Sequence, residues 1–299
     1  MKTTTITVVG LGSMGFGIAQ SLLRAGHLVF GVDIDAGLVE RLAAEGGRAA
    51  PLEAAVAASD IVVVVVLNAA QTESVLFGPD GCARAMRPGA VIVACATVPP
   101  DFSRTMAARA GDLGLNYLDA PISGGAVRAA TGELAIMASG SQVAFDRARP
   151  ALDAMAVNVF DLGRTAGAGS AMKAVNQLLA GVHIAAMGEA MALAASLGLD
   201  LARVVEVITR SAGNSWMFEN RAPHVVEADY TPRSAVDIWP KDLAIVTGIA
   251  AKAHLQVPIT ETALAQFRAA AAAGDGQIDD AAVVKVYARA AGIKLPGDA

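Results

Sequence analysis

The chain is poor in cysteine and in charged residues. Its 299 residues include two cysteines, Cys82 and Cys95, which are too few for a disulfide framework and have no second thiol at a metal-binding spacing. Both are expected to be inert core residues. Charged residues make up only 17% of the chain and the net charge is −5, with no run of lysine or arginine that would suit nucleic acid. These absences favour a protein that acts on small molecules.

The sequence offers neither a metal-binding pattern nor a targeting segment. Residues 1–5 lead directly into an apolar strand, without the apolar core and small-residue cleavage site of a signal peptide. We therefore expect a cytoplasmic protein. No histidine has a partner at a metal-ligand spacing, so we predict no metal site at His27, His183, His224 or His254.

Long uninterrupted apolar runs are scarce, although the hydrophobic fraction is 54% and the mean hydropathy is +0.49. The purest run, Ile61 to Leu67, is far shorter than the roughly 18 residues of a membrane-spanning helix. It is typical of a strand buried on both faces. The longer stretch from Gln177 to Leu201 is interrupted by His183, Glu189 and Asp200. We therefore expect no membrane span.

The first half of the chain alternates short β-branched runs with helical segments, the pattern of parallel βαβ units. This alternation predicts a doubly wound α/β sheet. The expected strands are residues 6–9, 28–32, 61–67, 91–94, 116–119, 134–138 and 158–161, and the expected helices are 15–25, 38–45 and 52–58.

From about residue 170 the pattern is helical, with breaks at Gly, Pro or Asn-Ser. A glycine-rich stretch, residues 163–169, precedes the change. We therefore predict an α/β domain over residues 1–163 and an all-α domain over residues 164–299. The expected helices of the second domain are 170–197, 201–211, 214–220, 240–254, 259–273 and 279–291.

A glycine motif, Gly10-Leu11-Gly12-Ser13-Met14-Gly15, directly follows the first expected strand and opens a helix. In a GxGxxG loop the first glycine permits a tight turn, the second admits a pyrophosphate, and the third lets helix and strand pack closely. Asp33 ends the second expected strand, where a carboxylate accepts hydrogen bonds from the adenosine ribose. The context predicts a Rossmann-type domain that binds a dinucleotide. The alternatives are a glycine turn that only joins strand to helix, or a methyltransferase-type loop.

Asp33 also favours NAD as the cofactor. Its carboxylate would repel the 2′-phosphate of NADP, and the neighbouring Ile34 and Asp35 include no arginine that would bind one.

A polar face is expected at the start of the long helix. If this helix begins near Ser170, then Lys173, Asn176 and Gln177 lie at positions i, i+3 and i+4 on one face. The rest of the helix is nearly all apolar. Two interpretations are open at this point: a functional lysine with amide neighbours, or a solvated lysine in the first turn.

Two further motifs, Asp119-Ala120-Pro121-Ile122-Ser123-Gly124-Gly125 and Lys241-Asp242-Leu243, accompany the glycine loop and the segment Gly167 to Gln177. With these four motifs in order, the chain resembles the β-hydroxyacid dehydrogenase family, which includes 3-hydroxyisobutyrate dehydrogenase, tartronate semialdehyde reductase and 6-phosphogluconate dehydrogenase. The motifs span nearly the whole chain.

The resemblance implies a role for each matching residue. Lys173 is implied to be the general acid/base, and Lys241 to lie by both cofactor and substrate. Substrate contacts are implied for Ser123, Gly124, Gly125, Asn176 and Gln177. Cofactor contacts are implied for Gly10, Leu11, Gly12, Ser13, Met14, Gly15, Asp33, Leu67, Asn68 and Thr97.

One position departs from the family pattern. Many relatives have asparagine four residues after the lysine, where this chain has Gln177. A longer amide there is expected to reposition the substrate hydroxyls. Together with segments 67–72 and 177–183, this makes the chain most similar to the branch that acts on L-threonate, a four-carbon sugar acid.

The expected activity is NAD-dependent oxidation of a small hydroxy acid, with L-threonate oxidised at C2 to a 2-oxo acid. A base must remove the hydroxyl proton, and lysine serves only where its surroundings hold its pKa below the usual ~10.4. The alternatives are a 3-hydroxyisobutyrate dehydrogenase, a tartronate semialdehyde or glyoxylate-type reductase, or a dinucleotide-binding sensor without catalysis. Apolar helices in excess of one small core predict a homodimer or homotetramer.

Overall fold

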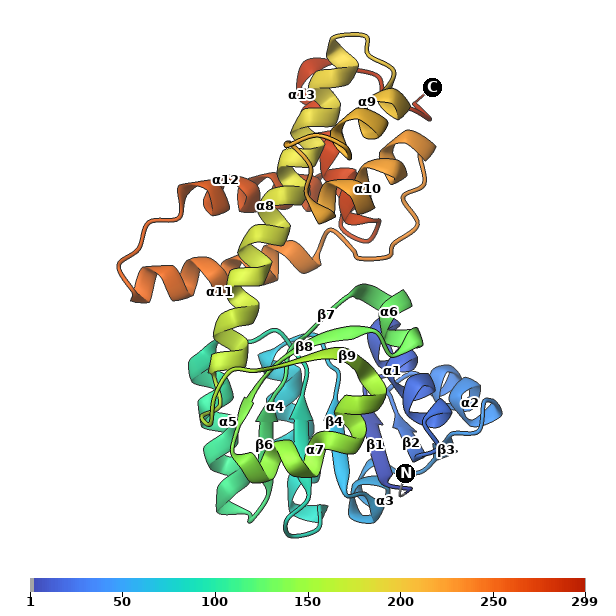
Figure 1. Ribbon diagram of the computed structural model, residues 1–299, viewed down its shortest axis with the longest axis vertical. Helices are drawn as coiled ribbons and strands as arrows, with labels where there is room; N and C mark the ends of the chain where they lie inside the picture. Colours follow the sequence, from blue (N-terminus) through green and yellow to red (C-terminus); the bar gives the residue numbers. More distant parts are fainter. Residues whose placement is uncertain (1–2, 299) are drawn as a thin grey trace. The chain divides into compact units, whose positions relative to one another are not determined.

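The chain folds into two compact units, Met1–Lys173 and Ala174–Ala299, in a computed structural model that describes residues 3–298 (Figure 1). The first unit contains the sheet, and the second is helical. Helix α8 (Ala168–Ser196) begins in the first unit and continues into the second.

The first unit is built on a nine-stranded sheet with the order β3-β2-β1-β4-β5-β6-β8-β7, and β9 pairs with β8. From β3 to β6 the neighbouring strands are parallel, whereas β8 is antiparallel to β6 and β7. The strands are β1 (Thr5–Val9), β2 (Leu28–Val32), β3 (Arg48–Ala49), β4 (Ile61–Val64), β5 (Val91–Ala94), β6 (Asn116–Asp119), β7 (Ile122–Ser123), β8 (Leu134–Gly140) and β9 (Ala156–Asp161).

Helices cover both faces of this sheet (Figure 1). Side chains of β4 alternate between the two faces, so Ile61 and Val63 join the core cluster of α1 and α7, while Val62 and Val64 join that of α3, α4 and α5. The predicted doubly wound sheet is therefore confirmed. The helices are α1 (Ser13–Arg24), α2 (Ala36–Ala44), α3 (Leu52–Ala58), α4 (Ala69–Phe77), the 3₁₀ turn η1 (Cys82–Ala85), α5 (Pro100–Asp112), α6 (Gly125–Thr131) and α7 (Gln142–Met155).

Strand β4 is shorter than the apolar run that predicted it. It ends at Val64 rather than Leu67. A Cβ built on Gly10 would lie 2.3 Å from the carbonyl oxygen of Val65, so the backbone there packs against the glycine loop instead of extending the sheet.

In the second unit the described residues form helices, and their only β pairing is an isolated bridge between Ala235 and Asp279. Its core includes Met191, Phe218 and Phe267, and Phe267 stacks on the Trp239 ring with the centroids 5.5 Å apart. The predicted all-α C-terminal domain is confirmed. After α8 come α9 (Leu201–Ile208), α10 (Trp216–Glu227), α11 (Ile238–Lys252), α12 (Pro258–Ala270), the π turn η2 (Ala271–Asp275), the 3₁₀ turn η3 (Asp280–Val283) and α13 (Val284–Ala291).

Helix α8 is long and apolar enough to cross a membrane by length and composition alone. It has 29 residues, and its most apolar window has a mean hydropathy of 1.6 with 44% of the residues buried in the protein. Ile184, Met187 and Met191 on this helix belong to the second unit's core. The same length and composition occur in the core helix of a soluble protein, so this helix is weak evidence for a membrane span.

Candidate functional site

The predicted cofactor residues of the first unit lie along one edge of the sheet, whereas Lys241 lies on α11 in the second unit. Strands β1, β2, β4, β5 and β6 are parallel neighbours, so their carboxyl ends share that edge. The glycine loop follows β1, Leu67 and Asn68 follow β4, Thr97 follows β5, and Asp33 follows β2. The strand order reverses between β1 and β4, and ligands of doubly wound sheets bind beside such a switch point.

The three motif glycines meet different surroundings. Gly10 has φ +92°, in the region that favours glycine. A Cβ on Gly15 would lie 1.8 Å from the carbonyl oxygen of Gly10, whereas a Cβ on Gly12 would meet nothing within 4 Å. Gly10 and Gly15 are therefore required by the packing of the loop, while Gly12 leaves open space over the loop.

That open space lies at the N-terminus of α1, which Ser13, Met14 and Gly15 begin. No side chain caps this helix, and its first turn has no acidic residue. Unpaired N–H groups and the helix dipole at such an end suit a diphosphate. The arrangement fits the dinucleotide that the motif predicts.

Asp33 is fixed beside the loop by its own hydrogen bonds. One carboxylate oxygen accepts from the Leu11 N–H at 2.5 Å, and the other accepts from the Asp35 N–H at 2.9 Å. The side chain of Ile34, next along the chain, is fully exposed. A carboxylate held at the end of β2 with an exposed apolar neighbour suits the ribose and base of adenosine.

Asn68 has a structural partner. Its side-chain oxygen caps α4 by accepting from the Gln71 N–H at 2.9 Å, and the Gln71 side chain accepts from the Leu67 N–H at 2.8 Å. These two bonds fix the backbone that follows β4. Leu67 itself is half exposed, and Thr97 is partly buried beyond β5.

The predicted substrate loop follows β6 and makes a sharp turn. Ser123 ends β7 and is partly buried. Gly124 and Gly125 then have φ values of +138° and +77°, which residues other than glycine rarely adopt. Helix α6 begins directly at Gly125, so this turn presents a helix N-terminus, an arrangement suited to an anion such as a carboxylate.

Lys173 lies in the second turn of α8, and the residue is only 7% exposed. The alternative of a solvated first-turn lysine therefore does not hold. The helix start is tied to the sheet by Asp119, the last residue of β6, whose carboxylate accepts from the Gly167 N–H, the Ser170 N–H and the Ser170 hydroxyl. Sequence reasoning included Asp119 in a motif but gave it no role.

In the second unit, a chain of side-chain hydrogen bonds joins α8 to α11. The Asn176 amide donates to the Gln177 oxygen at 2.9 Å, and the Gln177 amide donates to Asp242 at 2.5 Å. Asp242, only 2% exposed, also pairs with the Lys241 ammonium. Both ends of the Gln177 side chain thus have protein partners. Asp242 connects Gln177 and Lys241, although the sequence motif that included Asp242 gave it no role.

The acidic, histidine and cysteine side chains of the described residues form no metal-binding cluster. Residues 3–298 contain no group of three His, Cys, Asp or Glu side chains placed to hold an ion. His224 is paired with Asp279 at 2.8 Å inside the second unit, and His27 accepts from the Thr4 N–H.

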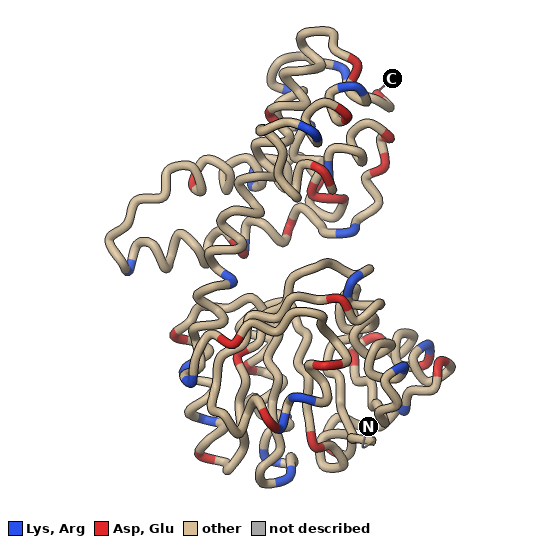
Figure 2. Tube along the Cα trace, in the orientation of Figure 1, with Lys and Arg blue, Asp and Glu red and all other residues tan. Residues whose placement is uncertain are grey.

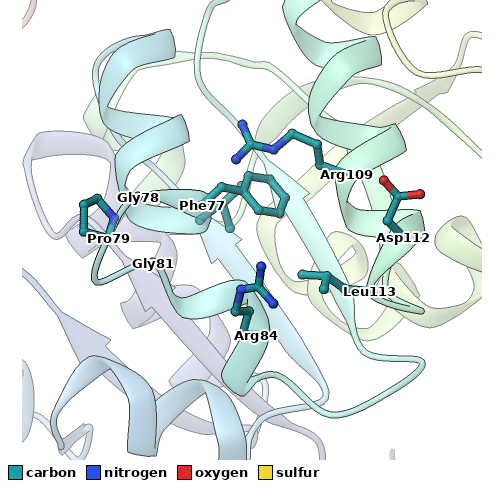
Figure 3. A pocket seen from close by; sticks show the side chains of 9 residues that line it. Phe77, Gly78, Pro79, Gly81, Arg84, Arg109, Asp112 and Leu113 are labelled. Atoms are coloured by element: carbon teal, nitrogen blue, oxygen red, sulfur yellow. The ribbon is translucent and has the colours of Figure 1, made fainter.

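A separate cavity of about 240 Å³ lies in the first unit (Figure 3). None of the predicted site residues lines it. It is surrounded by the end of α4, η1 and the end of α5, with lining residues Leu76, Phe77, Gly78, Pro79, Gly81, Arg84, Arg109, Asp112 and Leu113.

Cationic and acidic residues are interspersed along the chain (Figure 2).

The fold and the glycine loop define a dinucleotide-binding protein. Residues 5–163 match the family model of the NAD binding domain of 6-phosphogluconate dehydrogenase, and residues 167–287 match that of the NAD-binding domain of NADP-dependent 3-hydroxyisobutyrate dehydrogenase. The chain belongs to the β-hydroxyacid dehydrogenase family, as its motifs indicated. It is an enzyme that acts on hydroxyl groups with a nicotinamide cofactor.

Relatives match the chain over nearly its whole length. L-threonate dehydrogenase of Cupriavidus necator is 50% identical over 296 residues, 98% of each chain. The 2-hydroxy-3-oxopropionate reductase of Escherichia coli K12 is 31% identical over 96% of this chain and 98% of its own. A solved structure of 3-hydroxyisobutyrate dehydrogenase from Salmonella typhimurium has a TM-score of 0.90 at 50% identity, covering 94% of this chain and 99% of its own.

Proposed function

We propose that the protein oxidises L-threonate at C2 to the 2-oxo acid with NAD. The observation that carries this proposal is the buried Lys173, in the same unit as the glycine loop and three residues after Ser170, whose N–H donates to Asp119. The 50% identical relative acts, by its name, on L-threonate.

The chemistry requires a base and a place for the substrate anion. When bound, NAD takes up the hydride that leaves C2. Lys173 Nζ removes the hydroxyl proton at the same carbon, a task worth about 10²–10⁴-fold in rate for a positioned base. The N–H groups around Ser123, Gly124 and Gly125 and the Ser123 hydroxyl bind the carboxylate.

The side-chain amides of Asn176 and Gln177 on α8 have different roles in this proposal. Asn176 orients the substrate hydroxyl, and Gln177 holds Asn176 by accepting its N–H. Lys241, paired with Asp242, supplies positive charge toward cofactor and substrate. The longer side chain of Gln177 is what brings its amide to Asp242.

A substrate panel tests the proposal. Purified protein is mixed with NAD and, separately, L-threonate, D-threonate, 3-hydroxyisobutyrate and glycerate, and NADH absorbance is followed. We expect the highest kcat/KM with L-threonate. A higher kcat/KM with another acid would overturn the substrate assignment, and no turnover of any acid would overturn the activity.

A second candidate substrate is 3-hydroxyisobutyrate. It is favoured by the Salmonella structure, which is named a 3-hydroxyisobutyrate dehydrogenase and is as similar in sequence as the threonate enzyme. 3-Hydroxyisobutyrate lacks the C2 hydroxyl at which L-threonate would be oxidised, so the panel separates the two acids.

We further propose a soluble, cytoplasmic homodimer or homotetramer, with cofactor binding in residues 1–163 and substrate binding and assembly in residues 164–299. Exposed apolar side chains on α8 support assembly, since Val175, Leu179 and Leu193 are each at least half exposed. Light scattering after gel filtration tests it, because one chain has a mass of 30.2 kDa. A monomer at micromolar concentration would contradict the proposal.

A further inference from the structure

The carboxylate of Asp119 is buried among hydroxyl and backbone N–H donors. The residue is 1% exposed. One carboxylate oxygen accepts from the Ser170 hydroxyl at 2.7 Å. The other accepts from the Gly167 N–H at 2.8 Å, the Ser170 N–H at 2.9 Å and the Ser139 hydroxyl at 3.3 Å.

These donors belong mainly to the beginning of α8. The first N–H groups of a helix have no intrahelical acceptor, and a carboxylate near them is stabilised by the helix dipole. An ordinary capping residue lies directly before its helix. Asp119 instead lies 51 residues before Ser170, so its side chain fastens α8 to the end of β6.

The backbone around this contact has little room to shift. Gly167 has φ +103°, and a Cβ on Gly169 would lie 2.3 Å from the Met137 carbonyl oxygen. The Gly169 N–H also donates to the Ser139 hydroxyl at 2.9 Å. The helix start is therefore pressed against β6 and β8 and held there by the two side chains, Asp119 and Ser139.

The same residue begins the substrate loop. The chain leaves β6 at Asp119 and reaches Ser123 and Gly125 within a few residues. The backbone of Asp119 thus leads to the proposed carboxylate-binding turn, while its side chain fixes the helix that carries Lys173 one turn after Ser170.

We propose that Asp119 is a positioning residue that sets the distance between the Lys173 amine and the substrate loop. This inference rests on the proposed function, in which Lys173 is the base and residues 123–125 hold the substrate. A shift of about 1 Å in the position of a catalytic group lowers the rate roughly 100-fold. Loss of the Asp119 hydrogen bonds is therefore expected to lower kcat. The dinucleotide loop at residues 10–15 lies on another strand and keeps its affinity for NAD.

Asp119→Ala and Asp119→Asn test this role. Alanine removes every bond, and we expect kcat with L-threonate to fall about 100-fold, with the Kd for NAD unchanged. Asparagine keeps an oxygen for the two N–H groups and can donate to the Ser170 hydroxyl. We therefore expect Asp119→Asn to recover at least about tenfold of the lost kcat. The matched control is Asp200→Ala, which removes the carboxylate cap of α9.

The kinetics of these variants decide the inference. Loss of kcat in Asp119→Ala with recovery in Asp119→Asn supports it. An unchanged kcat in Asp119→Ala, an equal loss in Asp200→Ala, or the absence of recovery in Asp119→Asn overturns it. If Asp119→Ala does not fold, Ser170→Ala is measured in its place. The control is then Ser141→Ala, because Ser141 caps α7 through the Ala144 N–H. A loss of kcat in Ser170→Ala but not in Ser141→Ala supports the inference, and an equal loss of kcat in both variants overturns it.

Hydrogen exchange separates this inference from the proposed function. If the wild type oxidises no acid in the panel, the proposed function fails. The amides of residues 167–175 are then compared in wild type and Asp119→Ala, or Ser170→Ala if Asp119→Ala does not fold. Faster exchange there, without change in residues 10–15, supports fixing of the helix by Asp119, and unchanged exchange overturns it.

Discussion

Gly12 and Gly15 are both glycines of one motif, but they are required for different reasons. A Cβ on Gly15 meets a backbone oxygen at 1.8 Å, and one on Gly12 meets nothing. Gly15→Ala should therefore destabilise the fold by about 1–3 kcal/mol or more through overpacking. Gly12→Ala should leave the melting temperature unchanged and weaken NAD binding. Thermal unfolding and NAD titration check the pair; the opposite assignment of the two effects would contradict the account.

Asp33 is expected to set cofactor choice. Asp33→Ser removes the charge that repels a 2′-phosphate, so the ratio of kcat/KM with NADP to that with NAD should rise about tenfold, equivalent to about 1.4 kcal/mol. Steady-state kinetics with both cofactors measure it. Asp35→Ser is the control, because Asp35 caps α2 through the Gly37 N–H and a serine retains that function. An equal change in both variants would show that Asp33 has no special role.

Gln177 shows where residue-level reasoning from sequence stops. The spacing from Lys173 placed it on the correct face of α8, and the expected substrate contact followed from the family resemblance. In the structure the Gln177 side-chain oxygen accepts from the Asn176 amide, and the Gln177 side-chain N–H donates to Asp242. Asp242 comes from α11, 65 residues away, and no local pattern reports a partner at that distance.

Among the elements, those with strong local patterns were predicted well. Strands β2, β5 and β6 have the expected bounds, and α3 has them as well. Strands β3 and β7 have two residues each, too few to show a period. Helices α4 to α7 were not predicted. Helix α7 contains Pro150 in its interior, which weakens the usual helix pattern.

The start of α8 was predicted within two residues, but the hydrogen bonds that join it to Asp119 were not. The Asp119 cap depends on β6 and β8 lying side by side, with Asp119 paired directly with Ser139. Antiparallel pairing of β8 in an otherwise parallel region is a tertiary feature. The sequence therefore indicated Lys173 as a candidate, whereas only the fold shows what holds its helix.

Helix α10 is joined to η3 and the residue before it by a buried ion pair and a buried hydrogen bond. Arg221 pairs with Asp280 at 2.6 Å, and His224 pairs with Asp279 at 2.8 Å. Burial of Asp279 opposes its ionisation, but hydrogen bonds from His224 and the N–H groups of Arg233 and Ala281 outweigh it, so its pKa is lowered. A lowered folded-state pKa gives stability that is present above the unfolded value of about 3.9 and lost as pH falls through the folded value.

Asp279→Asn should therefore lower the free energy of unfolding at pH 7, and its deficit relative to wild type should shrink as pH falls below about 4. Urea unfolding at a series of pH values measures both. The exposed Asp60→Asn serves as the control, because Asp60 has only a surface pair with Arg87. A deficit for Asp279→Asn that is constant through this pH range would contradict the stated cause.

At the scale of the whole molecule, two family models meet near residue 165, and one helix runs from the first compact unit into the second. The first unit contains the glycine loop, residues 123–125 and Lys173. The second contains Asn176, Gln177 and Lys241. Composition alone predicted a small-molecule protein, and motifs spread over the chain were needed to indicate the reaction.

The most direct test of the central claim is the rate of NADH formation from L-threonate by Lys173→Ala, with Lys252→Ala, an exposed lysine at the end of α11, as control. We predict a fall in kcat of about 10²–10⁴-fold for Lys173→Ala, an unchanged Kd for NAD and a wild-type rate for Lys252→Ala. A Lys173→Ala enzyme that folds, binds NAD and keeps most of the wild-type kcat would contradict the account.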